Sequence, residues 1–298
     1  MINTLKSYGS VEEHASLKNL NTYHIGGTTK YLITPNSISD LQKTLKLLKE
    51  NNIKFMIIGN GSNIVLNDKE YDGAVIRLSK LNGIEIHKEM QMVYSEAGTM
   101  LPKLAIETVN SSLTGLEFAV GIPGTVGGSI YGNAGAYNAC LLDYVSSVTV
   151  LDENFDLKVL EHEEIDYSYR TSMFKENKNY IIVAAKLYLK SGDKENSLKI
   201  IEERRERRVQ SQPLEFPSAG SVFRNPEGDF AGRLIEACGL KGYKIGGAEV
   251  STKHANFIIN KANASSQDVY NLIKYVHKTV KEKTNVDLII EQEFIDWE

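Results

Sequence analysis

The stretch that most constrains the fold runs from Gly121 to Ala136 and reads GIPGTVGGSIYGNAGA. Its recurring glycines leave few side chains for a hydrophobic core, and glycine loses more conformational entropy on folding than any other residue. That cost is typical of backbone that must wrap closely around an extended, phosphate-bearing ligand. We therefore predict a ligand-binding loop here, with a glycine-rich loop of purely structural use as the alternative.

A second glycine-rich loop, from Gly59 to Asn63, directly follows the short apolar run Phe55–Ile58. Its glycines allow the backbone to approach a ligand, and its Ser and Asn side chains add hydrogen-bond donors. The Rossmann fingerprint does not fit, because a third glycine is missing and the β-like run Ile64–Leu66 replaces the helix. A tight turn that ends a strand is the alternative for this loop alone. Two such loops far apart in the sequence predict one dinucleotide held between two subdomains.

The length and charge limit the possible classes of protein. A chain of 298 residues suits two or three packed domains, and 42% hydrophobic with 24% charged residues is ordinary for a globular protein. The net charge of −4 gives no electrostatic reason to expect nucleic-acid binding. Basic residues are densest between Glu202 and Arg208, where interleaved acidic residues indicate a solvated helix face.

The cysteines and the apolar runs predict a cytoplasmic location. Cys140 and Cys238 are too few for a disulfide framework and lack metal-site spacing, so we expect reduced thiols in a reducing compartment and no metal site. The polar, mixed-charge start from Met1 to His14 does not resemble a signal peptide. The longest apolar run, Tyr180 to Ala185, is far too short to cross a bilayer, so no membrane insertion is expected.

Hydrophobic periodicity predicts alternating helices and strands in the first two thirds of the chain. A helix is expected over 40–50, capped by Ser37 or Ser39, and another near 101–110. A strand-helix-strand start is expected from strands at 31–33 and 55–58 around the first helix. The runs after Gly73 predict a mostly antiparallel sheet: 74–78, 84–87, 92–95, 148–151, 157–160 and 181–189.

The last third of the chain follows a polar turn at Ser191–Lys194, where we place a domain boundary. Helices are expected over 197–208, over a short segment capped by Asp229 and ending at Gly239, and over an amphipathic segment that Ser265 or Ser266 caps. The buried stripe of that last helix is expected to hold Val269, Leu272, Ile273, Val276 and Val280. Strands are expected at 255–259 and 288–290.

Six motifs, taken in order, carry a family resemblance. They are Asn21-Thr22-Tyr23-His24-Ile25-Gly26-Gly27, Gly59-Asn60-Gly61-Ser62-Asn63, Gly121-Ile122-Pro123-Gly124-Thr125-Val126-Gly127-Gly128, Tyr169-Arg170-Thr171-Ser172-Met173-Phe174, Pro217-Ser218-Ala219-Gly220-Ser221-Val222-Phe223-Arg224-Asn225-Pro226 and Lys253-His254-Ala255-Asn256-Phe257. Together they resemble the signature of the UDP-N-acetylenolpyruvoylglucosamine reductase (MurB) family, from about Asn21 to Glu293. The short stretch between Leu189 and Pro213 resembles the family's shorter second type, common in Gram-positive bacteria.

The resemblance implies an α+β, vanillyl-alcohol-oxidase/PCMH-type flavin fold. Residues 1–75 and 76–192 would form two FAD-binding subdomains, and 193–298 an α+β substrate-binding domain. It also implies non-covalent FAD, NADPH as hydride donor, and reduction of UDP-N-acetylglucosamine enolpyruvate to UDP-N-acetylmuramate for peptidoglycan. We expect a monomer or a weak oligomer.

The resemblance also implies residue roles. The FAD-binding set is Gly59, Asn60, Gly61, Ser62, Asn63, Gly121, Ile122, Pro123, Gly124, Thr125, Gly127, Gly128, Asn133, Ala134 and Gly135. The substrate-binding set is Tyr169, Arg208, Asn225 and His254. Arg170 would stabilise charge on the substrate carboxylate, Ser221 would donate a proton, and Glu291 would assist with the enolate.

Each catalytic residue also has a plain structural interpretation. Arg170 could be a surface arginine, Ser221 a turn or helix cap, and Glu291 an exposed strand carboxylate. The family's Glu-Val-Arg triplet reads Glu291-Gln292-Glu293 here, so Glu293 is a rival to Glu291. Ser211 stands where the family often has a phosphate-binding lysine, so Arg207, Arg208 or Arg224 would have to replace that contact.

Two rival functions share some of these motifs. An alcohol or sugar oxidase on the same fold would keep the glycine-rich loops but not the Arg170 and Ser221 motifs. Many such oxidases tether FAD through a histidine, for which His24 is the candidate to check. A non-catalytic nucleotide-binding module would need neither Arg170 nor Glu291.

Overall fold

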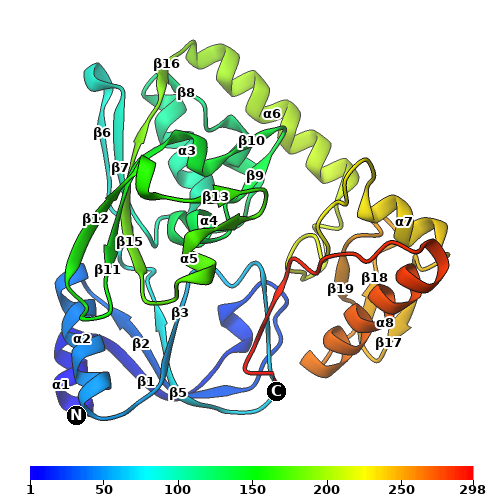
Figure 1. Cartoon of the computed structure of the whole chain (residues 1–298), viewed down its shortest axis with the longest axis horizontal. Coiled ribbons are helices and arrows are strands. Elements are labelled where there is room, and N and C mark those ends of the chain that lie inside the picture. Colours follow the sequence, from blue (N-terminus) through cyan, green and yellow to red (C-terminus); the bar gives the residue numbers. More distant parts are fainter. Residues whose placement is uncertain (298) are drawn as a thin grey trace. The chain divides into compact units, whose positions relative to one another are not determined.

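A computed structural model describes residues 1–297 of the chain (Figure 1). The α-helices are α1 Ile2–Tyr8, α2 Ile38–Glu50, α3 Leu101–Asn110, α4 Val126–Tyr131, α5 Met173–Glu176, α6 Lys194–Ser211, α7 Ala231–Ala237 and α8 Ser266–Thr284. The longer strands are β1 Gly9–Ser16, β2 Thr28–Pro35, β3 Phe55–Ile58, β5 Tyr71–Arg77, β6 Ile84–His87, β7 Met92–Glu96, β11 Val145–Leu151, β12 Leu157–Glu161 and β15 Ile181–Tyr188. The short strands are β4 Ile64–Leu66, β8 Leu113–Thr114, β9 Gly135–Ala136, β10 Ala139–Cys140, β13 Tyr167–Ser168, β14 Thr171–Ser172, β16 Lys190–Ser191, β17 Lys244–Ile245, β18 Ala248–Val250, β19 Ile258–Asn260 and β20 Glu293–Ile295.

The chain divides into two compact units, and each unit is made of segments that are separated in the sequence. The first unit comprises 1–13, 31–60 and 73–206, and the second comprises 14–30, 61–72 and 207–298. Strands β1, β2 and β5 and helix α6 each run from one unit into the other. The division into 1–75, 76–192 and 193–298 stays a prediction.

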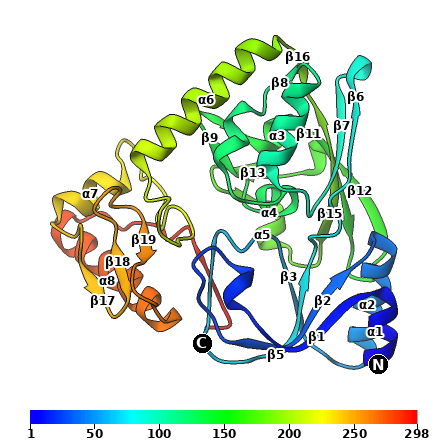
Figure 2. The same ribbon diagram turned by 180° about the vertical axis from the view of Figure 1, so that it is seen from behind.

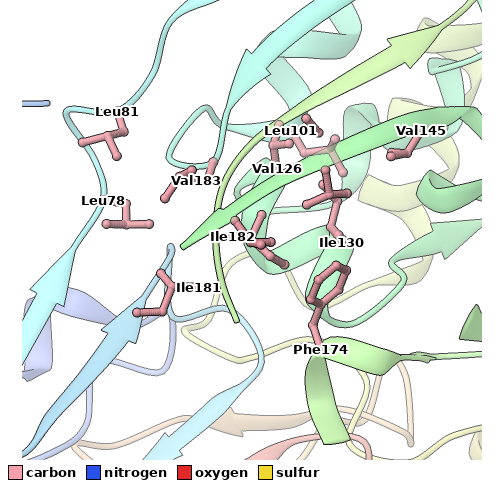
Figure 3. Packing of buried hydrophobic residues seen from close by; sticks show 14 of the residues in the cluster. Leu78, Leu81, Leu101, Val126, Ile130, Val145, Phe174, Ile181, Ile182 and Val183 are labelled. Atoms are coloured by element: carbon pink, nitrogen blue, oxygen red, sulfur yellow. The ribbon is translucent and has the colours of Figure 1, made fainter. Parts of the chain in front are cut away.

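The core of the first unit is built around an antiparallel sheet with strand order β12-β11-β15-β7-β6. This confirms the predicted antiparallel sheet for the runs from 84 to 189. The run 74–78 was wrongly included, because it forms part of β5, which pairs in parallel with β3 in a separate sheet. Helices α3 and α4 lie along one side of the sheet (Figure 1). Figure 3 shows Leu101 of α3 and Val126 and Ile130 of α4 close to β15, which carries Ile182 and Val183. The sheet and these helices share one hydrophobic cluster, so the glycine-rich segment that contains α4 is attached to a rigid core.

The strand-helix-strand start of the chain is also confirmed. Helix α2 follows β2 and begins after Ser37, whose hydroxyl accepts a hydrogen bond from the N–H of Asp40. Strand β3 follows at once and pairs in parallel with β5, in a sheet ordered β1-β2-β5-β3. The loop at Gly59 therefore begins at the carboxyl end of a parallel strand, where α/β proteins commonly bind ligands.

The core of the second unit packs α7 and α8 beside the sheet β17-β18-β19 (Figure 2). Helix α8 starts with a capping box between Ser265 and Asp268, so the cap is the first of the two predicted serines. The predicted stripe of this helix is confirmed as its buried face. Helix α6 begins three residues earlier than expected, where Asp193 accepts hydrogen bonds from the N–H groups of residues 195 and 196.

Three expectations for the second unit are wrong. Residues 288–290 form only an isolated bridge, between Phe223 and Ile290, and the last strand is β20, which pairs in parallel with β4. The strand expected at 255–259 begins only at Ile258 and ends at Asn260, as β19. It starts late because the Asn256 side chain bonds the N–H and carbonyl of Phe223 and takes the place of strand pairing. Helix α7 has Phe230 as its N-cap, since the Asp229 carboxylate is bound by Arg233.

No helix among residues 1–297 is both long and apolar enough to cross a bilayer.

Candidate active site

The two glycine-rich loops meet in the first unit. Asn60 donates a hydrogen bond from Nδ2 to the carbonyl oxygen of Pro123 at 2.7 Å. A Cβ atom on Gly59 would lie 2.5 Å from Oγ1 of Thr125, which is closer than real Cβ contacts come. Glycine is therefore required at position 59 for the loops to approach each other. Segments that the sequence separates by about sixty residues are therefore in direct contact.

The segment around α4 has the chemistry that a phosphate-bearing cofactor needs. The Thr125 side chain accepts from the N–H of Gly128 at 3.3 Å, and Gly127 packs so closely that its Cβ would lie 2.8 Å from Cβ of Ala97. Gly128 is exposed, and only Oγ1 of Thr125, at 3.4 Å, would lie within 4 Å of a Cβ atom at this position. The buried hydroxyl of Ser129 has no hydrogen-bond partner among residues 1–297, which is rare for a buried polar atom. A cofactor oxygen would satisfy it, so the segment fits FAD.

Arg170 lies at the tip of a two-residue turn between β13 and β14, in the first unit. Its φ of 60° is in the left-handed region, which is uncommon for a residue with a side chain and clusters at functional sites. Two hydrogen bonds fix this hairpin to the glycine-rich segment: Nδ2 of Asn133 donates to Ser168 O at 2.9 Å, and Oγ of Ser172 donates to Tyr131 O at 2.7 Å. The guanidinium lies 5.5 Å from the ring centre of Tyr169, which is itself exposed.

The Asn133 side chain has a structural duty that the motif alone does not reveal. Besides donating to Ser168, it accepts from the N–H of Leu142 at 3.4 Å, and the residue is 3% exposed. Its predicted contact with FAD would therefore use the backbone. The position of Arg170 depends on the same side chain.

In the second unit, the loop from Gly61 to Asn63 is held from both sides. Gly61 accepts from the N–H of Thr22 at 3.2 Å, and a Cβ on Gly61 would lie 2.3 Å from Leu20 O. Asn63 donates from Nδ2 to Glu291 O at 3.1 Å and accepts at its carbonyl from the N–H of Glu293 at 3.0 Å. This loop therefore contacts both the first motif and the C-terminal segment.

The second unit also brings the segment of Ser221 beside that of Glu291. The N–H of Glu291 donates to Val222 O at 2.8 Å, and Ser221 itself forms a bridge with Phe257. Gly220 precedes the serine at a φ of 71°, so the turn depends on glycine. Glu291 and Glu293 are both half-buried, and both adjoin Asn63, so the choice between them stays a prediction.

The substrate-side candidates in the second unit already have protein partners. Arg208 donates from Nε to Gln212 at 2.8 Å, and Asn225 accepts from the N–H of Ala231 at 3.1 Å, at the start of α7. His254 accepts at Nδ1 from the N–H of Asn256 at 3.2 Å, and burial lowers the pKa of its imidazole. A neutral ring that accepts at Nδ1 carries its proton on Nε2, so His254 can donate there.

Sequence reasoning missed two side chains near these segments, Ser129 and Gln292, and it named Arg224 only as one of three arginines that would replace the lysine contact. Ser129 lies within the stretch from Gly121 to Ala136, but a serine among glycines gives no signal that its hydroxyl is buried. Gln292 is 3% exposed although it lies between two glutamates. Nε of Arg224 is buried without a hydrogen-bond partner in the described chain, 1–297.

Comparisons with known proteins identify the family. The model of the UDP-N-acetylenolpyruvoylglucosamine reductase C-terminal domain matches residues 212–295, and that of an FAD-binding domain matches 29–158. The UDP-N-acetylenolpyruvoylglucosamine reductase of Clostridium novyi is 44% identical over 278 residues, which are 93% of this chain and 90% of the relative. The chain belongs to the UDP-N-acetylenolpyruvoylglucosamine reductase family. The family and the FAD cofactor that the six motifs predict are thus confirmed, and the chain is an FAD-dependent oxidoreductase.

Solved structures agree with this assignment to the reductase family. The crystal structure of the reductase (MurB) from Thermus caldophilus has a TM-score of 0.82 and 32% identity, covering 96% of this chain and 99% of that chain. Berberine bridge enzyme from Eschscholzia californica, with a TM-score of 0.50 and 16% identity, covers 65% of this chain and 43% of that chain. The second likeness shows the fold alone. The predicted α+β flavin fold is confirmed.

Proposed function

We propose that this reductase converts UDP-N-acetylglucosamine enolpyruvate to UDP-N-acetylmuramate in the cytoplasm, as a step in peptidoglycan precursor synthesis. FAD, when bound by the residues assigned below, would supply the chemistry of hydride transfer from NADPH to the enolpyruvyl methylene carbon. The observation that best supports the reaction is that the Ser221 and Glu291 segments are hydrogen-bonded to each other in a member of this family.

The cofactor-binding role is assigned to the glycine-rich segments. Within the first unit, Asn60 bonds Pro123 and Gly59 packs against Thr125, so the first loop adjoins the segment 121–128. The role of 121–128 and 133–135 is to present backbone N–H groups to phosphate oxygens. Ser129 adds a hydroxyl without a protein partner among residues 1–297. Gly61, Ser62 and Asn63 keep the FAD-binding role that the resemblance implies.

The proton-donor role is assigned to Ser221. Hydride addition to the methylene carbon leaves the neighbouring carbon strongly basic, because its charge is shared with the carboxylate. A serine hydroxyl is a weak acid, but it can protonate such a carbon at close range from a fixed position. Gly220 allows the sharp turn that presents the hydroxyl.

Charge stabilisation is assigned to Arg170 and Glu291. The substrate carboxylate gains negative charge as the reaction proceeds, and a preorganised guanidinium aimed at it lowers the barrier. Glu291 assists only if it is protonated or closely paired, since an ionised carboxylate would repel the enolate.

The negative charge of the substrate diphosphate has to be balanced by cationic side chains. Ser211 stands where the resemblance implies a phosphate-binding lysine, so another cation must make that contact. Arg224 is the strongest candidate for the missing contact, because its buried Nε has no partner among residues 1–297 while Nε of Arg208 is bound to Gln212. Tyr169, Asn225 and His254 complete the proposed substrate contacts.

A steady-state assay tests the proposal. The purified protein should be yellow, and its oxidation of NADPH should depend on UDP-N-acetylglucosamine enolpyruvate. The oxidase alternative predicts oxygen consumption with simple sugars and flavin that stays with the denatured protein. The non-catalytic alternative predicts UDP-sugar binding without turnover.

A further inference from the structure

A buried polar network lies directly behind the Ser221 turn. The hydroxyl of Tyr23 donates to Oε1 of Gln292 at 3.0 Å. Nε2 of Gln292 donates to the carbonyl oxygens of Ala219 at 3.0 Å and Gly220 at 3.4 Å. Tyr23 is 0% and Gln292 3% exposed, so these bonds are shielded from water. All of these residues belong to the second unit.

The two accepting carbonyls belong to the residues just before Ser221, so they set the orientation of the peptide groups that lead into it. Gly220 has open space on its Cβ side, with no atom within 4 Å of the position. Side-chain packing at that position therefore does little to fix the turn. The Gln292 amide supplies the missing restraint.

The residues on either side of Gln292 are anchored as well. The N–H of Glu291 donates to Val222 O, and the N–H of Glu293 donates to Asn63 O. One short segment thus bonds the serine turn and the loop of residues 61–63. Movement of the Gln292 side chain would change the position of Ser221 relative to Glu291.

Tyr23 determines which way the Gln292 amide faces. Burial raises the pKa of its phenol, so the hydroxyl stays protonated and acts as a donor. A donor at Oε1 leaves Nε2 directed at the two carbonyls.

We propose that Gln292 is a positioning residue that fixes the Ser221 hydroxyl for proton delivery, and that Tyr23 orients its amide. This inference rests on the proposed role of Ser221. A small displacement of a catalytic group can cost about 100-fold in rate, so the effect should fall on the proton-transfer half of the reaction.

The first test is Gln292→Leu, which keeps the approximate size and removes the amide. Stopped-flow reoxidation of the reduced flavin by the UDP-sugar should slow about 10- to 100-fold. Reduction by NADPH and the KM for the UDP-sugar should each stay within about threefold, on the same reasoning that only proton delivery is affected. The slowed step should also show a larger solvent deuterium isotope effect, which a general loss of structure would not produce.

A second variant, Gln292→Glu, provides a pH signature. A buried glutamic acid can donate to a carbonyl when protonated and cannot when ionised, and burial raises its pKa. Reoxidation in this variant should approach the wild-type rate at low pH and fall as pH rises. Tyr23→Phe, which keeps the Gln292 donors, should give a smaller loss of about two- to fivefold, as expected for loss of one orienting contact.

The outcomes separate this inference from the proposed function. Absence of turnover in the wild-type protein would remove the proposed function and the inference with it. Wild-type turnover, together with unchanged reoxidation in Gln292→Leu and a flat pH ratio for Gln292→Glu, would overturn the inference alone. If Gln292→Leu fails to fold, as thermal unfolding of the FAD-free protein would show, the pH profile of Gln292→Glu decides.

Discussion

The side-chain amide of Asn60 donates to the carbonyl oxygen of Pro123 at 2.7 Å, across 63 residues of sequence. This bond holds together, within the first unit, the two loops that the sequence marks as backbone for a dinucleotide. Each loop alone could be a tight turn. Their contact is what makes a shared cofactor the better explanation.

Substitutions of two glycines should separate folding from FAD binding. Gly128→Ala places a Cβ at 3.4 Å from Thr125 Oγ1, which the fold tolerates, and alanine favours an exposed helix by about 0.5–1 kcal/mol. The unfolding temperature of the FAD-free variant should therefore be at least as high as that of the wild type. Its FAD affinity, measured by fluorescence titration, should nevertheless fall, because the methyl group occupies the backbone face assigned to the cofactor.

Gly59→Ala is the contrasting variant. Its Cβ would lie 2.5 Å from Thr125 Oγ1, so the loops must separate, at a cost of about 1–3 kcal/mol in folding free energy. Both the unfolding temperature and the FAD affinity should drop. If Gly128→Ala binds FAD normally, the cofactor does not approach this part of the backbone.

Ser221→Ala should leave reduction of the flavin intact and slow the proposed proton transfer to the substrate. NADPH should still bleach the flavin absorbance, and reoxidation by the UDP-sugar should slow by about 100-fold or more, in line with loss of a general acid. Ser218→Ala, a half-buried serine in the same motif, is the matched control and should behave as wild type. Normal turnover in Ser221→Ala would exclude the assigned role.

Arg224→Gln tests the cation that replaces the missing lysine. A hydrogen bond to a charged group contributes about 1.5–3 kcal/mol, so the KM for the UDP-sugar should rise about 10- to 100-fold while NADPH reduces the flavin normally. Arg233→Gln is the control, since this exposed arginine is paired with Asp229. An unchanged KM in Arg224→Gln would return the phosphate contact to Arg207 or Arg208.

The lowered pKa of buried His254 predicts that the folded protein loses stability on mild acidification. Burial lowers its pKa in the folded protein below the unfolded value of about 6.5, so the unfolded chain binds the proton more tightly. The free energy of unfolding should hold above that pH and decline as pH falls from it towards the folded pKa. Urea unfolding at pH 7.5 and 5.5 measures the decline, which should be smaller in His254→Gln; an equal decline in both proteins would contradict the assignment.

Much of the fold could be predicted because local signals agree with it. The apolar periodicity from Leu101 and the stripe through Val269 and Val276 lie on faces that are buried in the structure. The last strand was missed because β20 depends on a parallel partner, β4, more than two hundred residues away. The isolated apolar run at Leu288–Ile290 looks like a better strand when it is considered by itself.

The candidate site also has a part that the sequence predicts and a part that it does not. Glycine motifs identify the cofactor loops because close backbone approach demands glycine, as at Gly59 and Gly61. The network of Tyr23 and Gln292 could not be predicted, since the two residues are 269 positions apart and neither type suggests a buried pair. Supporting contacts of this kind appear only when the chain is folded.

Single turnover under anaerobic conditions tests the central claim most directly. Protein reduced with NADPH and freed of excess nucleotide is mixed with UDP-N-acetylglucosamine enolpyruvate, and flavin absorbance and product are followed together. The expected result is recovery of the oxidised flavin spectrum with about one UDP-N-acetylmuramate formed per flavin, as direct hydride transfer requires. Flavin that stays reduced in the presence of the UDP-sugar, and returns to the oxidised form only when oxygen is admitted, would contradict the proposed reaction.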